Sequence, residues 1–226
     1  MDEILLIDKP AGITSFDVIR RLRPRLGVKK IGHAGTLDPL ATGLMILGVG
    51  QGTKKLTEFI ELDKEYVAEI LFGESRTTGD MEGEIVESVT EIAITPQALS
   101  EAISSLVGIL TLPVSAYSAI KKDGIPMYKR AREMVKIGKT VTDVPLREMK
   151  VYEAEELSIA INRDRKQLAV GRVVVKVRFF VGSGTYIRSL SEELGRRLDY
   201  PATLLSLRRT KIGRFDIKDA RRIENF

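Results

Sequence analysis

The stretch Gly32-His33-Ala34-Gly35-Thr36-Leu37-Asp38-Pro39-Leu40-Ala41-Thr42-Gly43 is the most informative segment of this 226-residue chain. It holds the only histidine of the sequence, one carboxylate and three glycines. Glycine lets a backbone turn tightly and approach a ligand closely, and Pro39 restricts Asp38 to an extended conformation. The segment therefore predicts a stiff loop that presents His33 and Asp38.

Local chemistry leaves two interpretations of this loop open, a functional loop or a plain turn, because Asp before Pro is a common turn former. The stretch has neither the G-x-x-x-x-G-K-[ST] spacing of a phosphate loop nor a G-x-G-x-x-G fingerprint. One His and one Asp fall short of the three or four ligands of a metal site. We therefore expect no metal and no organic cofactor.

The charge balance favours nucleic acid as a partner. The sequence has 36 Lys and Arg against 31 Asp and Glu, a net charge of +5, and 43% hydrophobic residues, enough for a packed core. An ordinary solvated surface would give the same excess, but the basic residues gather in clusters, which is typical of a surface that follows phosphates. The clusters are Arg20-Arg21-Arg23-Arg25, Lys29-Lys30, Lys121-Lys122, Lys129-Arg130-Arg132, Arg208-Arg209 and Arg221-Arg222.

The absence of cysteine excludes disulfides and thiolate chemistry, and it fits a reducing compartment. The apolar run Ile4–Ile7 is too short for a secretion signal, and no segment is long enough to span a bilayer. We expect a cytoplasmic protein without membrane association, and a monomer by default.

Periodicity, caps and breakers predict strands and helices that interleave irregularly, which favours an α+β fold with a mixed, largely antiparallel central sheet flanked by helices. The expected strands cover residues 3–8, 44–49, 64–72, 146–160, 168–181 and 203–212. The expected helices begin at Thr14 or Ser15, near Thr53, at Thr95-Pro96, near Met127 and after Gly184. Residues 110–126 are expected to be loop-like, and the two long β-type runs to form a hairpin.

Five motifs in order resemble those of the bacterial TruB-type family of tRNA pseudouridine synthases. They are Asp8-Lys9-Pro10-Ala11-Gly12-Ile13-Thr14-Ser15, the Gly32–Gly43 loop, Lys64-Glu65-Tyr66, Pro113-Val114-Ser115-Ala116-Tyr117-Ser118-Ala119-Ile120-Lys121 and Gly184-Thr185-Tyr186-Ile187-Arg188. The resemblance runs from about residue 4 to residue 215. It implies the pseudouridine synthase catalytic fold and isomerisation of uridine 55 in the T-loop of tRNA to pseudouridine.

The resemblance assigns Asp38 as the catalytic aspartate and Arg188 as the arginine that pairs with it. A guanidinium binds a carboxylate bidentately and keeps it ionised. Whether Asp38 attacks the ribose or the uracil stays open. Tyr186 and Arg188 are two residues apart, so their side chains share a side only if Gly184–Arg188 is extended, which we expect.

The same resemblance implies an apolar and aromatic binding site for the displaced uracil. It makes Tyr66 a catalytic residue that stacks on the base, with Tyr186 beside it and Leu207 lining the pocket. Tyr66 shares a strand face with Ala68, Ile70 and Phe72, so a core position is the alternative. His33 fills the gap left by the flipped nucleotide, or else is an ordinary structural histidine.

Further substrate contacts follow from the resemblance and the basic clusters. Asp80 matches an aspartate that lines the site, and Lys9 is expected at the substrate. The candidates for RNA phosphate contacts are Lys9, Lys54, Lys121, Lys129, Arg130 and Arg132. Taken singly, each of these charges is more typical of a solvated surface than of a phosphate contact.

We expect residues 1–226 to form a single catalytic domain with an RNA-gripping insertion at about residues 110–145 and without the C-terminal PUA domain of many family members. Two alternative functions remain on the sequence alone. One is an RNA-binding or tRNA-folding protein that keeps the fold without turnover. The other is a guide-RNA-dependent pseudouridylation subunit, which normally carries the further C-terminal domain.

Overall fold

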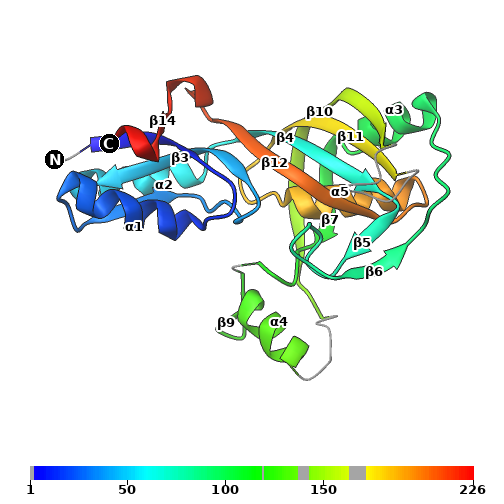
Figure 1. Ribbon diagram of the computed structural model, residues 1–226, viewed down its shortest axis with the longest axis horizontal. Helices are drawn as coiled ribbons and strands as arrows, with labels where there is room; N and C mark the ends of the chain where they lie inside the picture. Colours follow the sequence, from blue (N-terminus) through cyan, green and yellow to red (C-terminus); the bar gives the residue numbers. More distant parts are fainter. Residues whose placement is uncertain (1–2, 119, 137–142, 163–171) are drawn as a thin grey trace. The chain divides into compact units, whose positions relative to one another are not determined.

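A computed structural model describes residues 3–118, 120–136, 143–162 and 172–226 of the chain (Figure 1). Within these residues the strands are β1 (Glu3–Lys9), β2 (Ile31–Ala34), β3 (Thr42–Val49), β4 (Lys64–Phe72), β5 (Glu74–Arg76), β6 (Ile85–Ser88), β7 (Gly108–Pro113), β8 (Lys121–Lys122), β9 (Ile125–Pro126), β10 (Leu146–Asn162), β11 (Arg172–Val181), β12 (Ala202–Ile212), β13 (Phe215–Asp216) and β14 (Arg221–Arg222).

The helices of the described residues are α1 (Ser15–Leu26), α2 (Leu56–Ile60), α3 (Pro96–Ser104), α4 (Met127–Lys136) and α5 (Ile187–Arg197), with short 3-10 turns η1 (Gly50–Lys55), η2 (Ile217–Asp219) and η3 (Ile223–Asn225). The main sheet follows the order β14-β1-β3-β12-β4-β11-β10-β7, with β2 on β3 and β13 on β12. Its pairings are antiparallel except for β14 with β1 and β3 with β12, among those whose register is described. The expected α+β fold with a mixed, largely antiparallel sheet is confirmed.

The chain divides into two compact units. The first unit comprises Met1–Val67, Arg178–Gly184 and Ser206–Phe226, and the second comprises Ala68–Val177 and Thr185–Leu205. Strands β4, β11 and β12 give residues to both units, so the boundary follows spatial contacts rather than sequence order. Each unit is described below by itself.

The first unit packs an apolar core around β3, whose residues after Thr42 are all buried. One cluster of this core joins Ala34, Leu44, Ile46, Leu56 and Ile212. Helix α1 buries Val18, Ile19 and Leu22. The predicted N-terminal signal of this helix is confirmed at Thr14, which forms a capping box with Asp17, and Gly27 ends the helix with φ 64°.

Both edges of β3 are occupied in the first unit, which explains its continuous apolar run. Strand β1 pairs with β3 along its whole length, from Glu3 opposite Val49 to Lys9 opposite Gly43. The other edge is shared, since β2 pairs with Ile46–Val49 and β12 reaches Thr42 and Gly43. A fork therefore separates β2 and β12 at the middle of β3, and residues 35–41 leave β2 at this fork.

The second unit contains the β7–β10 ladder, the β5–β6 hairpin and helices α3, α4 and α5 (Figure 1). Helix α5 buries Ile187, Leu190 and Leu194. The small β8–β9 hairpin contacts α4. The loop predicted for residues 110–126 is confirmed in its described middle part, 114–118 and 120, and is wrong at both ends. There β7 occupies Gly108–Pro113, and two short strands flank the Asp123-Gly124 turn, where Asp123 adopts φ 51°.

Candidate active site

Asp38 lies in the connection between β2 and β3, in the first unit, and it is half-buried. The loop is compact, since the backbone N–H of Ala41 donates to the carbonyl of Asp38 at 3.1 Å. Its main chain is fixed from two directions, by the Lys9–Ser15 segment and by β12. The functional loop predicted from the sequence therefore has a defined geometry around its carboxylate.

The Lys9–Ser15 segment holds the two residues that flank Asp38. The hydroxyl of Ser15 accepts from the N–H of Leu37 at 2.8 Å and donates to the carbonyl of Leu37 at 3.0 Å. The carbonyl of Pro39 accepts from the N–H of Gly12 at 2.8 Å and from Nζ of Lys9 at 3.2 Å. The backbone on each side of Asp38 is thus fixed by hydrogen bonds, which is the arrangement that orients a reactive side chain.

Lys9 has a different environment from the one expected. It is fully buried, and its ammonium also donates to the carbonyls of Pro10 and Ile13 at 3.0 and 2.7 Å. A buried ammonium that is satisfied by carbonyls supports the loop and does not face an RNA phosphate, so the expectation of a phosphate contact is corrected for Lys9. The sequence predicted that either Thr14 or Ser15 caps α1. A capping pattern carries no information about long-range contacts, so the hydrogen bonds of Ser15 with Leu37 were not predicted.

Arg209 on β12 holds the loop from the other direction. It is 1% exposed, and it donates to the carbonyls of Leu44, Gly35 and Thr36 at 2.7, 3.3 and 3.4 Å. The basic cluster Arg208-Arg209 was interpreted as part of a phosphate-binding surface, and this is wrong for Arg209 because its guanidinium is buried. Its neighbour Arg208 pairs with both carboxylate oxygens of Asp8, at 3.1 and 2.8 Å.

His33 lies on β2 and is half-buried. Burial lowers the pKa of His33 below its ordinary value of 6.5, and the charge of Arg209 lowers it further. A neutral imidazole suits both of the roles considered for His33, because neither stacking against a base nor packing in a protein requires a charge. The inherited role of filling the flipped nucleotide's place stays a prediction.

Tyr66 and Lys64 lie on the buried face of β4, in the first unit, and the predicted strand over residues 64–72 is confirmed with its alternation. Burial lowers the pKa of Lys64 to about 8, with Arg209 acting in the same direction and Asp63 against it. The ammonium of Lys64 donates to the carbonyl of Ile60 at 2.6 Å. Leu207 is buried on β12, and its carbonyl accepts from the hydroxyl of Thr42 at 3.3 Å. The first unit thus carries the candidates Asp38, His33, Tyr66 and Leu207.

Arg188 is the centre of a polar cluster in the second unit. Its Nη1 donates to the carbonyl of Thr78 at 2.9 Å and to the hydroxyl of Ser115 at 2.7 Å, and its Nε lies 3.8 Å from a carboxylate oxygen of Asp80. Arg188 and Asp80 are both buried. Asp80 also accepts from the hydroxyl of Thr78 at 2.5 Å and from the N–H of Glu82 at 3.1 Å. The structure therefore brings together the two predicted residues Arg188 and Asp80, and it adds Ser115 from the fourth motif.

The conformation expected for Gly184–Arg188 is wrong in its second half. Helix α5 begins at Ile187, so Arg188 lies in the first helical turn, whereas Tyr186, the residue before the helix, is extended, with φ −101° and ψ 109°. An extended segment was expected because an arginine and a tyrosine two residues apart point to the same side only in a strand. A helix start between them aims the arginine at Thr78 instead, and Tyr186 is half-buried at the N-cap.

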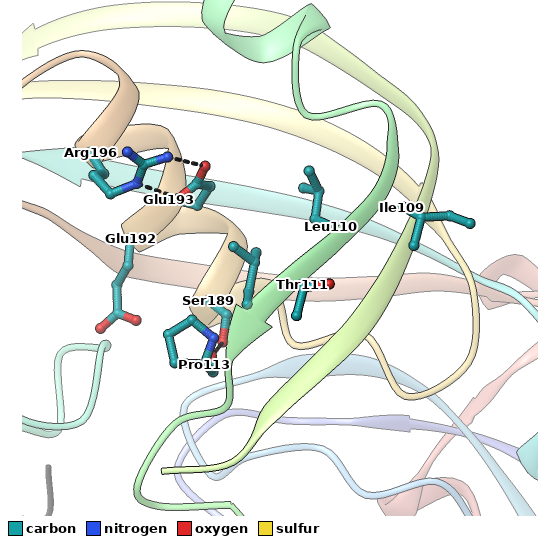
Figure 2. Close-up of a pocket in the computed structure, with 9 residues that line it drawn as sticks. Ile109, Leu110, Thr111, Pro113, Ser189, Glu192, Glu193 and Arg196 are labelled. Carbon is teal, nitrogen blue, oxygen red and sulfur yellow. Dashed lines mark hydrogen bonds and ion pairs between the residues drawn. The ribbon is translucent and has the colours of Figure 1, made fainter. Parts of the chain in front are cut away.

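A pocket of about 440 Å3 lies in the second unit between β7 and α5, lined by Ile109, Leu110, Thr111, Leu112, Pro113, Ser189, Glu192, Glu193 and Arg196 (Figure 2). Figure 2 shows that Arg196 binds Glu193, at 2.7 and 2.8 Å, whereas Glu192 points away from this pair. The hydroxyl of Ser189 donates to the carbonyl of Pro113 at 2.7 Å. Neither Arg188 nor Asp80 lines this pocket, so it is separate from their cluster.

Glu192 connects the pocket lining with the Arg188 cluster electrostatically. Burial of its carboxyl raises the pKa of Glu192 above the ordinary value, the charge of Arg188 opposes this, and Asp80 adds to it. Part of the side chain nevertheless reaches solvent. The Gly79 backbone lies so close to the Glu192 carboxyl that a Cβ at Gly79 would approach it to 2.9 Å. No local pattern in the sequence marks Glu192, which lies in an ordinary helical stretch.

The basic candidates for phosphate contacts fall into two groups. Lys54, Lys121 and Lys129 are exposed, as a phosphate contact requires. Arg130 instead donates to the carbonyl of Lys122 at 2.7 Å and pairs with Asp123 at 2.8 Å, so it stabilises the β8–β9 hairpin against α4. The side chain of Arg132 lies outside the described residues, as do residues 119 and 137–142 of the expected RNA-gripping insertion.

Asp38 and Arg188 belong to different units, and their pairing stays a prediction. In the described part of the chain no group of three or more His, Asp or Glu residues is arranged to hold a metal ion. No described helix is long and apolar enough to cross a membrane.

The comparison with known families matches residues 23–187 to the N-terminal domain of the TruB family of pseudouridylate synthases. Among curated proteins, the chain is 43% identical over 220 residues to tRNA pseudouridine synthase B of Leifsonia xyli subsp. xyli and 40% identical over 217 residues to that of Corynebacterium efficiens. Each match covers 96% of this chain and 69% of the relative.

Among solved structures, the chain resembles an H/ACA RNP bound to a substrate RNA containing 2'-deoxyuridine, with a TM-score of 0.66, and an archaeal box H/ACA sRNP Nop10–Cbf5 complex, with a TM-score of 0.65. Both are 22% identical, and each match covers 98% of this chain and 51% of the other. The chain thus spans about half the length of those chains, and the likeness supports the fold alone. The family match and the curated relatives, together with the fixed Asp38 loop, show that this chain belongs to the TruB family of pseudouridylate synthases.

Proposed function

We propose that this protein converts uridine 55 in the T-loop of tRNA to pseudouridine. The observation that carries the proposal is the Asp38 loop, whose backbone is fixed on both sides of the carboxylate by Ser15 and by Lys9 with Gly12. The identity of about 40% to relatives named tRNA pseudouridine synthase B supports tRNA as the substrate. Family membership, with Asp38, Tyr66 and Arg188 all present in the sequence, favours turnover over RNA binding alone.

The reaction exchanges one bond of the nucleoside for another without a net change in composition. The bond from N1 of uracil to C1' of ribose breaks, the bond from C5 to C1' forms, C5 loses its hydrogen, and N1 gains a proton. Asp38 is the group that acts on the detached nucleotide, as nucleophile or base. A stacked base is inaccessible to a carboxylate, so the nucleotide must first be flipped out of the RNA.

The other candidates have roles around Asp38 in this proposal. Arg188 orients Asp38 and keeps it ionised. Tyr66 stacks on the uracil, Leu207 and Tyr186 line its pocket, and His33 contacts the RNA at the position that the nucleotide has left. Asp80 is held close to Arg188, which supports its place at the edge of the site.

The test is release of tritium from a T-arm hairpin that carries 5-tritiated uridine at the target position. We expect release by the wild-type protein without metal, cofactor or guide RNA, and none from the same hairpin when the tritiated uridine is placed outside the loop. Asp38→Asn is expected to abolish release while it retains hairpin binding. Release by that variant at the wild-type rate would contradict the mechanism, and release that depends on an added guide RNA would favour the alternative of a guide-dependent subunit.

We also propose that the protein acts in the cytoplasm, where its tRNA substrate is made, and as a monomer. One copy of the chain carries every residue assigned above, so the proposal requires no second copy at the site. Light scattering of the protein with and without a T-arm hairpin tests the oligomeric state. A dimer that forms only with RNA would contradict the monomer.

A further inference from the structure

The largest fully buried side chain of the described residues is a cation, Arg209. In the described part of the chain its hydrogen-bond acceptors are the carbonyls of Leu44, Gly35 and Thr36, and no ion pair joins it to a carboxylate. Removing a charge from water without a counter-ion is costly. An aliphatic side chain would fill the same volume without this cost, so the guanidinium needs an explanation beyond packing.

The position of Arg209 in the sheet supplies that explanation. Arg209 lies opposite Gly43 in the parallel pairing of β12 with β3, while β2 occupies the same edge of β3 only from Ile46 onward. The side chain of Arg209 therefore fills the fork at which the chain leaves β2. It binds the central strand through Leu44 and the departing loop through Gly35 and Thr36.

The close approach of β12 makes this contact rigid. A Cβ on Gly43 would lie 2.3 Å from the carbonyl oxygen of Arg209 and 2.7 Å from its nitrogen, and Gly43 adopts φ 109°. The backbones of β12 and β3 are thus in contact, and the main chain at Arg209 has no room to shift toward β3. Asp38 lies two residues beyond Thr36, so the start of the loop is fixed in relation to the sheet.

We propose that Arg209 is a positioning residue for the reaction, which sets the backbone course of the loop that carries Asp38. This inference rests on the proposed function. Its planar guanidinium places three separate nitrogens on the three carbonyls, Nε on Leu44, Nη1 on Thr36 and Nη2 on Gly35, and the single nitrogen of a lysine cannot reproduce this spread. Arg209 touches neither substrate nor reacting atoms, so its effect is on the rate of the chemical step and not on the affinity for RNA.

The experiment compares Arg209→Lys and Arg209→Met with Arg172→Lys. Arg172 is the matched control, since it is a buried arginine of the second unit that donates to Val89 and Ser88 and lies 3.7 Å from Glu74. We expect Arg209→Lys to lower the single-turnover rate of pseudouridine formation by about 10- to 100-fold, the effect of a small misplacement. Its affinity for the hairpin and its folded fraction should remain near the wild-type values. Arg172→Lys should retain the wild-type rate.

A second measurement does not depend on activity. His33 is the only histidine, so its NMR titration is unambiguous. The charge of Arg209 contributes to the low pKa of His33, and Arg209→Met should raise that pKa, whereas Arg172→Lys should leave it unchanged. The amide signals of Gly35 and Thr36 should shift in Arg209→Lys, which is the variant to use if Arg209→Met fails to fold.

The outcomes separate this inference from the proposed function. An unchanged rate in Arg209→Lys, or a rate that falls only with the folded fraction, overturns the positioning role. If the wild-type protein forms no pseudouridine, the proposed function fails. The signals of His33, Gly35 and Thr36 then still show whether Arg209 holds the loop, and unchanged signals would overturn that as well.

Discussion

The hydroxyl of Ser15 forms two hydrogen bonds with the backbone of Leu37. It accepts from the N–H at 2.8 Å and donates to the carbonyl at 3.0 Å. Both residues are buried. A serine hydroxyl has one donor hydrogen and two acceptor sites, so a single oxygen satisfies both backbone polar groups of Leu37, the residue before Asp38.

Ser15→Ala is expected to remove both hydrogen bonds and leave the N–H and the carbonyl of Leu37 buried without partners. We expect a loss of about 1–3 kcal/mol in the free energy of unfolding, the usual cost of unsatisfied buried groups. The single-turnover rate should fall by about tenfold or more, because the loop loses its fixed course. Urea unfolding and tritium release measure the two effects.

The control for this prediction is Ser191→Ala, which removes a buried hydroxyl that donates to the carbonyl of Ile187 at 2.9 Å inside α5. It should lose some stability and keep its rate. Ser15→Thr retains the hydroxyl and should recover part of the rate. Equal rates in Ser15→Ala and Ser191→Ala would show that the contact serves stability alone.

Arg188 and Asp80 provide a double-mutant test of the catalytic role of Arg188. Arg188→Ala leaves Asp80 as a buried carboxylate without this partner, and we expect it to lower both stability and turnover. Adding Asp80→Asn removes the uncompensated charge and should restore much of the stability. If Arg188 acts on Asp38, the double variant remains inactive. Turnover equal to that of Asp80→Asn alone would show that Arg188 serves only Asp80.

Lys121 and Lys129 are exposed residues of the predicted RNA-binding segment. Each phosphate contact releases counter-ions, so changing either lysine to Ala should lower the slope of log affinity against log salt by about 1. Lys176→Ala is the control, since this partly exposed lysine pairs with Glu69 at 3.0 Å. A slope that stays the same in Lys121→Ala and Lys129→Ala would place the hairpin and α4 away from the RNA.

The depressed pKa of His33 predicts how stability depends on pH. The folded protein binds its proton less tightly than the unfolded chain, whose histidine titrates near 6.5. Between the folded pKa and 6.5 the unfolded state binds more protons, so the free energy of unfolding rises with pH there and falls as the pH drops below about 6.5. Urea unfolding from about pH 5 to about pH 7.5 measures this, and His33→Gln should flatten the profile in this range. An unchanged profile in that variant would assign the dependence to carboxylates.

Local patterns in the sequence predicted most of the main elements. The capping box at Thr14, the Pro after Thr95 and the alternation over β4 are each encoded within a few residues, so α1, α3 and β4 appear where they were expected. Strand β7 and the short β8–β9 hairpin were missed. The strand character of β7 depends on pairing with β10, far away in the sequence, and β8 and β9 have two residues each, too few to show a period.

The candidate site was predictable where a motif names its residues, and less so where burial decides the role. Asp38, Arg188 and Asp80 were assigned by motif, and their roles stay predictions. Lys9 and Arg209 were interpreted as basic surface residues because a sequence shows charge but not burial. Ser15 and Glu192 have side-chain surroundings set by residues far away in the chain, so no local pattern marks them.

The contact between β12 and β3 has a consequence for the protein while it is being synthesised. The carbonyls of Gly35 and Thr36 accept hydrogen bonds from the guanidinium of Arg209, which lies 174 and 173 residues later in the chain. A nascent polypeptide on the ribosome therefore carries an unfinished Asp38 loop until β12 has been translated. The loop can take its final course only after the strand that bears Arg209 has paired with β3.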